Sequence, residues 1–168
     1  MYKEDIKNTS QNNDNEIIIL YDSLFGNTKK VVGALSRGLE AGGFQVDSSP
    51  VQGFDIRRLR NYKTIAIGGP THMRGLSKPM KKFLRSLREN KIGSKSAFAF
   101  ETKASYNMAG SAGKKIIKNL KRMKIRIVYP LITGIVLARE GPLEKGTLNN
   151  MEKIGLEIAE MLNSSYKN

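Results

Sequence analysis

The amino-acid sequence predicts an α/β fold: a doubly wound, five-stranded parallel sheet in the order 2-1-3-4-5, with helices on both faces. Two observations favour it. Short apolar runs alternate along the chain with amphipathic helical patterns, which is typical of βαβ units. The runs are almost continuously apolar, as expected for parallel strands that are covered on both faces. In such a sheet, ligands bind at the carboxyl ends of the strands, near the point between strands one and three where strand order reverses.

The first part of the chain predicts a strand, a helix, an edge strand and a short helical segment. The helix has apolar side chains at helical spacing and ends at Gly42 and Gly43, which suit a helix C-terminus. Weak alternation and Pro50 favour an edge strand after it. We expect the strand to begin at residue 17 and the other elements to occupy residues 28–41, 44–51 and 55–60.

The remainder predicts three more strands and three more helices. Each of the first two strands ends in a loop of small and polar residues, at 70–75 and 102–113. Ser77 is placed to cap the helix after the first of these loops. The stretch 130–142 is apolar but broken, and we assign it no regular element. We expect strands at residues 63–69, 96–101 and 125–129, and helices after Ser77, around residues 116–123 and at residues 143–162.

Length and composition predict one domain. A chain of 168 residues has room for a single α/β core. We expect a disordered polar tail at residues 1–15, the domain at 16–163 and a polar tail at 164–168. The absence of Cys excludes disulfides, thiolate metal sites and a cysteine nucleophile. No stretch has the roughly 20 apolar residues of a spanning helix. Without Cys, redox chemistry does not indicate a compartment, and our default expectation is a cytoplasmic protein.

The positive charge is concentrated in the middle of the chain. The formal net charge is +14. Residues 57–126 hold 20 Lys and Arg against two acidic residues, whereas the rest of the chain holds 9 against 13. In the predicted topology, the helices after strands three and four lie side by side on one face. The expected result is a basic face, and like charges crowded there indicate an acidic partner nearby.

The loop at residues 23–28 is a candidate anion site. It contains Ser23, Asn27 and Thr28, whose short side chains can donate hydrogen bonds, and Gly26, which lets backbone approach closely. A strand that leads into a helix N-terminus offers unpaired amides and a favourable dipole to phosphate. No Lys or Arg lies within this loop. An ordinary turn capped by Asn27 or Thr28 is the other interpretation, and spacing alone leaves both open.

This segment resembles the signature of the flavodoxins and flavodoxin-like FMN proteins. That signature is an apolar strand, an aromatic residue, Ser or Thr, two variable residues, a small residue, a variable one and Thr. Val32 departs from it conservatively, since the family usually has Ala there. The resemblance covers about residues 16–162 and continues at residues 68–71, 110–120 and 141–148. The signature is matched by Ile19, Leu20, Tyr21, Ser23, Gly26 and Thr28.

The resemblance implies FMN as the cofactor and three loops that bind it. The first loop would hold the phosphate, and the second and third would pass the two faces of the isoalloxazine. Tyr106, the aromatic residue of the third loop, is the candidate stacking partner, with a surface or packing role as the alternative. The implied residues are Ser23, Leu24, Phe25, Gly26, Asn27 and Thr28 in the first loop, Pro70, Thr71, His72, Met73 and Gly75 in the second, and Thr102, Lys103, Ala104, Ser105, Tyr106 and Asn107 in the third.

Two other features, His72 and the glycine-containing stretch 110–115, give weaker indications of function. His72 is the only histidine and has no partner His or Cys, so we expect no metal site. It can pack or hydrogen-bond beside a flavin, or it can donate a proton in quinone or flavin chemistry. Residues 110–115 lack the glycine spacing of a P-loop, and we interpret them as a helix start. We predict no catalytic residue.

The sequence thus predicts an FMN-binding, flavodoxin-like electron-transfer protein. The resemblance implies redox partner proteins, and the basic charge favours partners with acidic surfaces; nucleic acid and anionic membrane are the weaker options. Two alternatives stay open. One is a flavodoxin-like quinone or protoporphyrinogen oxidoreductase, in which His72 would take part. The other is an FMN-free basic module that binds nucleic acid or anionic lipid.

Overall fold

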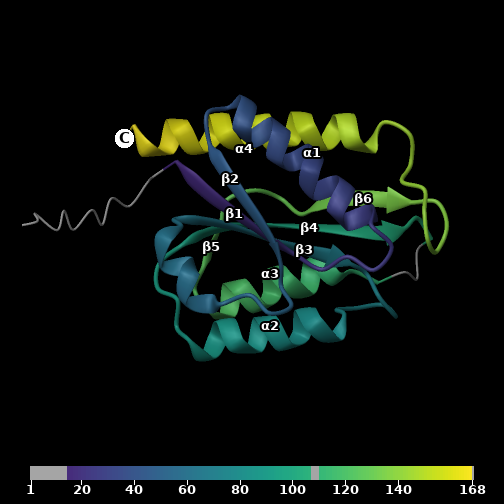
Figure 1. The fold of residues 1–168 in the computed structure, drawn as a ribbon, viewed down its shortest axis with the longest axis horizontal. Helices are drawn as coiled ribbons and strands as arrows, with labels where there is room; N and C mark the ends of the chain where they lie inside the picture. Colours follow the sequence, from purple (N-terminus) through teal and green to yellow (C-terminus); the bar gives the residue numbers. More distant parts are fainter. Residues whose placement is uncertain (1–14, 107–109, 168) are drawn as a thin grey trace, which may run out of the picture.

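A computed structural model describes residues 15–106 and 110–167. It confirms the predicted fold class: a parallel sheet in the order β2-β1-β3-β4-β5, with helices on both faces. Helices α1 and α4 cover one face and α2 and α3 the other (Figure 1). The strands are β1 (Glu16–Tyr21), β2 (Gln45–Pro50), β3 (Thr64–Pro70), β4 (Ser96–Ala104), β5 (Arg126–Ile127) and β6 (Ile132–Val136); the helices are α1 (Asn27–Ala41), α2 (Lys78–Glu89), α3 (Ala112–Arg122), α4 (Thr147–Tyr166) and the short 3₁₀ segment η1 (Ile56–Asn61).

The predicted fifth strand is in fact two strands. β5 pairs with β4 at only two residues, and β6 resumes the pairing further along the same edge of β4. Pro130 lies between them and has no N–H to give to the ladder, so the chain leaves the sheet there. The stretch to which we assigned no element therefore contains β6. Its carboxyl end adds a fourth loop to the edge where the other three meet.

The last helix begins later and ends later than predicted. Leu143 forms an antiparallel bridge with Val136, and the Glu144 amide donates to the Ile135 carbonyl at 2.8 Å, so the chain doubles back before a helix can start. The helix then runs to Tyr166, past the residue at which we expected the polar tail to begin. The Tyr166 hydroxyl contacts Thr64 Oγ1 at 3.1 Å, which ties this end to the sheet. β4 is also three residues longer than predicted.

Alternation along the strands divides the core into two layers. In β1, Ile17 and Ile19 pack toward α1 and α4, whereas Ile18 and Leu20 pack toward α2 and α3. The predicted apolar stripe of α2 is buried in the second layer, which leaves its lysines and arginines in solvent. In the part of the chain that the structure describes, no helix is both long and apolar enough to cross a membrane.

Helices α1 and α4 approach each other closely through glycines. A Cβ on Gly155 of α4 would lie 2.4 Å from the Leu35 carbonyl oxygen of α1, and a Cβ on Gly38 would lie 2.0 Å from the Glu152 carbonyl oxygen. Backbone atoms cannot yield to such contacts as a flexible side chain would. The seam therefore requires the absence of a side chain at both positions.

Replacing Gly155 by Ala should lower the free energy of unfolding by about 2–3 kcal/mol, because the new methyl group forces the two helices apart. Gly33→Ala is the matched control. A Cβ there meets only the Arg37 side chain at 3.7 Å, so the better helix propensity should raise stability by about 0.5–1 kcal/mol. Urea denaturation of both variants measures the difference. Equal effects of the two substitutions would contradict the close-packed seam.

Candidate functional site

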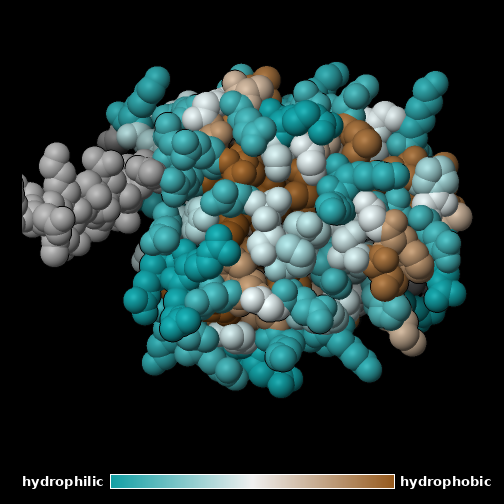
Figure 2. All heavy atoms as spheres, viewed as in Figure 1, coloured by the Kyte–Doolittle hydropathy of each residue, from teal (hydrophilic) through white to brown (hydrophobic). Residues whose placement is uncertain are grey.

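A pocket of about 490 Å³ opens at the carboxyl ends of the strands. Its size is within the range of small-molecule sites. Hydrophobic residues gather at this end of the molecule, at the right of Figure 2. The lining combines the three loops that the sequence indicated with the fourth loop after β6, at residues 24, 25, 27, 28, 70–73, 102–106 and 136–139.

The first loop leads into a helix N-terminus that no side chain caps. Gly26, the residue before α1, has a φ of 87°, which favours glycine, and a Cβ there would meet no atom within 4 Å. The first helical hydrogen bond runs from the Lys30 amide to the Gly26 carbonyl. The Lys29 amide reaches Ser23 Oγ only at a long 3.4 Å. The amides at the start of α1 are thus suitable donors for an anion.

Two neighbouring helices lack this property because serines occupy their N-termini. Ser77 accepts a hydrogen bond from the Met80 amide at 3.2 Å at the start of α2. Ser111 does the same for the Lys114 amide at 3.0 Å at the start of α3. Helix α4 is also uncapped, but the pocket lining ends at Arg139 and does not reach it. The start of α1 is therefore the one that offers free amides to the pocket, among the helices that the structure describes.

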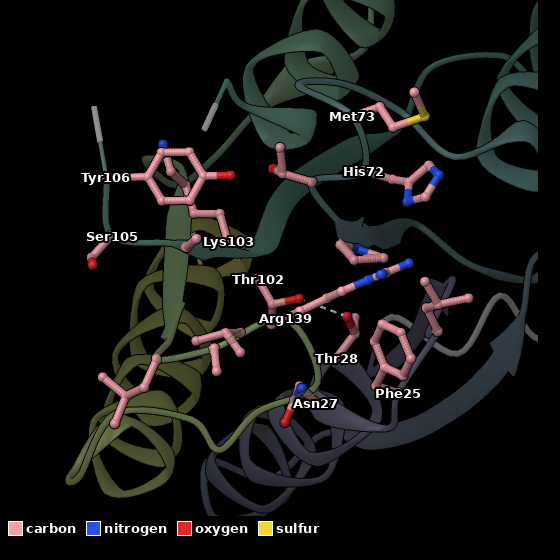
Figure 3. A pocket seen from close by; sticks show the side chains of 17 residues that line it. Phe25, Asn27, Thr28, His72, Met73, Thr102, Lys103, Ser105, Tyr106 and Arg139 are labelled. Atoms are coloured by element: carbon pink, nitrogen blue, oxygen red, sulfur yellow. Dashed lines mark hydrogen bonds between the residues drawn. The ribbon is translucent and has the colours of Figure 1, made fainter. Parts of the chain in front are cut away.

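The side chains of Asn27 and Thr28 have partners within the protein. Thr28 Oγ1 lies 2.9 Å from Thr102 Oγ1, and the Thr28 side chain is buried. Asn27 Nδ2 donates to the Glu140 carbonyl at 3.1 Å. These contacts fix the first loop to the end of β4 and to the fourth loop, as the dashed line in Figure 3 shows for the threonines. Both residues line the pocket, but their side chains are engaged within the protein. The backbone amides at the start of α1 are therefore the main candidate donors to a bound anion.

The second loop is a tight turn with strained residues at its tip. His72 and Gly75 exchange two backbone hydrogen bonds of 2.9 Å. Between them, Met73 and Arg74 have φ values of 44° and 64°, where non-glycine residues are disfavoured by about 1–3 kcal/mol each. Met73 is 89% exposed. Such strain at a pocket rim is typical of a functional loop rather than a stabilising one.

The third loop places Tyr106 on the opposite side of the pocket from His72 (Figure 3). Tyr106 is 65% exposed, so its ring is accessible to a planar ligand or to a partner. Lys103 and Ser105 lie near it. A Cβ on Gly110 would lie 2.5 Å from the Arg74 carbonyl oxygen, so this glycine allows the third loop to pass the second. Asn107, another predicted residue, lies outside the described residues.

The fourth loop was missed by sequence reasoning. It contributes Val136, Leu137, Ala138 and Arg139 to the lining, and the Arg139 side chain points across the pocket (Figure 3). The predicted anion site at residues 23–28 has no Lys or Arg of its own, and this loop brings a cation, Arg139, to the same pocket. The signal available in the sequence was an apolar stretch followed by Gly141-Pro142, which is the turn that ends a strand.

Of the predicted residues that the structure describes, three do not line this pocket. Ser23 and Gly75 line an adjoining cavity of about 530 Å³, which shares Leu24, Pro70, His72 and Met73 with the main pocket, and Gly26 lines neither. The adjoining cavity lies against the start of α2. Its lining includes three lysines and one carboxylate, Lys78, Lys81, Lys115 and Asp22.

These features fit a flavin mononucleotide. The uncapped start of α1 suits its phosphate, and Arg139 adds a cation at the same pocket. The large apolar side chains at the rim suit the flat ring system, because each is more than 40% exposed and would be covered on one side by a ligand. They come from all four loops: Leu24 and Phe25, Met73, Tyr106, and Leu137.

A model of one protein family, Flavodoxin, matches residues 19–152 of the chain. The chain belongs to the flavodoxin family. The cofactor of this family is FMN, and the function of its members is electron transfer to redox partner proteins. This agrees with the signature at residues 19–28. A comparison with curated proteins found no match.

Solved structures with the same fold include two short flavodoxin-type chains and one longer enzyme. A flavodoxin from the domain Archaea is 23% identical with a TM-score of 0.73, covering 88% of this chain and 99% of its own. A flavodoxin, WrbA-like protein from Agrobacterium tumefaciens is 18% identical (TM-score 0.71; 89% and 98% covered). Rubredoxin oxygen:oxidoreductase from Desulfovibrio gigas is 16% identical (TM-score 0.76) over 92% of this chain but only 37% of its own.

Gly26→Ala should weaken FMN binding about tenfold, which corresponds to about 1.4 kcal/mol of binding free energy. Alanine is strained at the positive φ of this position, and relief of the strain would shift the α1 amides away from the phosphate. Gly43→Ala is the matched control: its φ is 94°, a Cβ there also meets open space, and it lies at the other end of α1. Both variants should lose about 1–2 kcal/mol of stability. Flavin-fluorescence titration measures affinity. A loss of affinity as large for Gly43→Ala would contradict a phosphate site at Gly26.

Proposed function

We propose that this protein is a cytoplasmic, non-covalently FMN-binding electron carrier that takes electrons from one redox protein and passes them to another. The observation that carries the proposal is the rim of exposed apolar side chains around a pocket whose α1 end suits a phosphate. Exposed apolar surface of this kind marks a place where another molecule binds. A ring system bound there would keep an edge open to a partner's redox centre.

FMN supplies the redox chemistry when bound, because it accepts and releases electrons at its ring system. The protein's part is to hold and orient it. The amides that precede Lys30 would bind the phosphate, Arg139 would balance part of its charge, and Tyr106 would cover one face of the ring. The contact between Thr28 and Thr102 keeps the loops around it in register.

The basic face supports a partner with an acidic surface. The charged side chains of α2 and α3 are exposed, and Glu89 is the one acidic residue on these two helices. Within the described residues, the two ion pairs are Arg37–Glu152 and Arg57–Asp55, so neither involves these helices. Three cations of this face, Lys78, Lys81 and Lys115, line the cavity beside the pocket. A partner's carboxylates would dock there and bring its redox centre to the rim.

A second candidate is a flavodoxin-like quinone or protoporphyrinogen oxidoreductase. The adjoining cavity favours it, because a space of about 530 Å³ beside His72 could hold a small substrate. An FMN-free module that binds nucleic acid or anionic membrane through the basic face is a third candidate, and no feature of the pocket favours it.

The three candidates separate in two measurements on the full chain. Added FMN should bind with quenched fluorescence and a shifted absorption spectrum; a protein that leaves FMN unaltered would refute both flavin-dependent candidates. The loaded protein should then reduce quinone with NAD(P)H only when a partner reductase is present. Rapid turnover without a partner would refute the carrier and favour the oxidoreductase.

Reversing two lysines should slow electron transfer to an anionic oxidant. With the FMN-loaded, reduced protein, we expect K81E/K115E to lower the rate with ferricyanide by about tenfold at low salt, since steering by charge changes on-rates by roughly 10–1,000-fold. Each ferricyanide accepts one electron and becomes ferrocyanide. K145E/K153E changes the net charge equally through exposed lysines outside this face and is the control. Equal slowing by both pairs would contradict a local docking site.

The same field should act on the flavin potential. Positive charge near the ring stabilises reduced flavin, which carries a negative charge, and so makes the last electron easier to add. K81E/K115E should therefore shift the second couple to more negative values, by roughly 0.3 kcal/mol per charge at high dielectric. Potentiometric titration at low and high salt measures it. A couple that does not respond to the substitutions or to salt would contradict the effect.

A further inference from the structure

Glu101 is a buried carboxylate directly behind the pocket. It lies in β4, next to Thr102 of the pocket lining, and is 2% exposed. In the sheet it is paired with Gly69 of β3 on one side and Thr133 of β6 on the other. A carboxylate in the centre of a sheet is strongly disfavoured unless its charge is compensated.

Four neutral groups donate hydrogen bonds to this carboxylate. Oε2 accepts from Ser111 Oγ at 2.8 Å, from the Gly113 amide at 2.8 Å and from Thr71 Oγ1 at 3.2 Å. Oε1 accepts from Thr133 Oγ1 at 3.3 Å. Among the described residues, no basic side chain forms an ion pair with Glu101. The compensation thus comes from hydroxyls and from the N-terminus of α3.

Two of the hydroxyls can donate their hydrogen in only one direction, toward Glu101. Thr71 Oγ1 accepts from the Ala112 amide at 3.0 Å, and Ser111 Oγ accepts from the Lys114 amide at 3.0 Å. Each hydroxyl has one hydrogen, so each donates that hydrogen to Glu101. The side chain at position 101 must therefore accept at Oε2, and an apolar residue would leave these donors unsatisfied in the interior.

The carboxylate links three of the segments that form the pocket. Thr71 lies in the second loop and lines the pocket itself. Ser111 and Gly113 form the start of α3, where the third loop ends. Thr133 lies in β6, which leads into the fourth loop. One buried side chain therefore joins these three segments to one another.

A helix cap alone does not account for this arrangement. The Ser111 side chain already caps α3, so a carboxylate is not needed for that purpose. Glutamine would have nearly the same shape: its amide oxygen could accept the three bonds at Oε2, and its NH₂ group could donate to Thr133 Oγ1, which has free lone pairs. A neutral residue could thus satisfy the same partners, and what glutamate adds is charge.

We propose that Glu101 is a positioning residue for the flavin site, which acts through Thr71 and holds a fixed negative charge behind the ring system. It strengthens the hydrogen bonds that hold the second loop, since bonds to an ionised acceptor are the stronger ones. Its charge also opposes the negative charge of reduced flavin and so makes the second couple more negative. The proposal rests on the proposed FMN function.

Glu101→Gln tests the charge with the shape retained. In the full chain loaded with FMN, the ratio of the dissociation constants of reduced to oxidised FMN should fall by roughly threefold or more, and the second couple should become less negative. Thr133→Val is the control, because it removes one donor and leaves the carboxylate. It should leave the ratio unchanged. An unchanged ratio in Glu101→Gln, or an equal shift in Thr133→Val, would overturn the electrostatic role.

Glu101→Ala tests the positioning role. It should raise the dissociation constant of oxidised FMN by about tenfold, because Thr71 loses its acceptor and the second loop moves. If Glu101→Ala does not fold, Glu101→Asp serves instead: its shorter side chain keeps the charge but cannot reach all four donors, and it should weaken FMN binding while the ratio stays near that of the natural chain. Unchanged affinity in both variants would overturn the positioning role.

These outcomes are distinct from failure of the proposed function. If the natural chain does not bind FMN, its flavin fluorescence titration is flat and the electron-carrier proposal fails. If it binds FMN and none of the Glu101 variants alters affinity or potential, the inference about Glu101 fails alone. A loss of thermal stability without FMN, with no change in affinity or potential, would assign Glu101 a purely structural role.

Discussion

The arrangement of this protein depends on strands that are apolar on both sides. Ile17 to Leu20 are all fully buried, and a helix layer on each face of the sheet removes them from water. Parallel strands need crossover connections, which here are mostly helices, and the carboxyl ends then all lie at one edge. The loops that follow the strands therefore meet at this edge. The pocket is a consequence of how the sheet is covered.

The same constraint separates the charges. Right-handed crossovers place the helices that follow β3 and β4 on one face, while α1 and α4 cover the other. The lysines and arginines of α2 and α3 thereby lie on the same side of the sheet. The opposite face is held together by the close seam at Gly38 and Gly155. The α1 and α4 face is thus closely packed, whereas the α2 and α3 face places lysines beside the pocket.

Local patterns were enough to predict every strand except β6, each of the helices apart from its exact ends, and three of the four loops. The apolar stripe of α2 and the cap at Ser77 each involve residues within one or two turns, so they can be recognised in the sequence. The fourth loop was missed because Pro130 interrupts the apolar stretch that contains β6, so this stretch was not recognised as a strand. The contact between Thr28 and Thr102 and the hydrogen bonds to Glu101 join residues that are far apart along the chain. No periodicity encodes such contacts, and only the assembled sheet brings them together.

Capping decides which helix start is available to an anion. Helices α1, α2 and α3 each begin at the edge where the loops meet, and each has an N-terminal dipole that would attract phosphate. Ser77 closes the start of α2, and Ser111 with Glu101 closes that of α3 by occupying its amides with a hydroxyl and a carboxylate. Only the start of α1, after Gly26, offers its amides to the described pocket. If FMN binds as proposed, the buried Glu101 at the start of α3 would repel its phosphate from that position, and the open N-terminus of α1 would attract it.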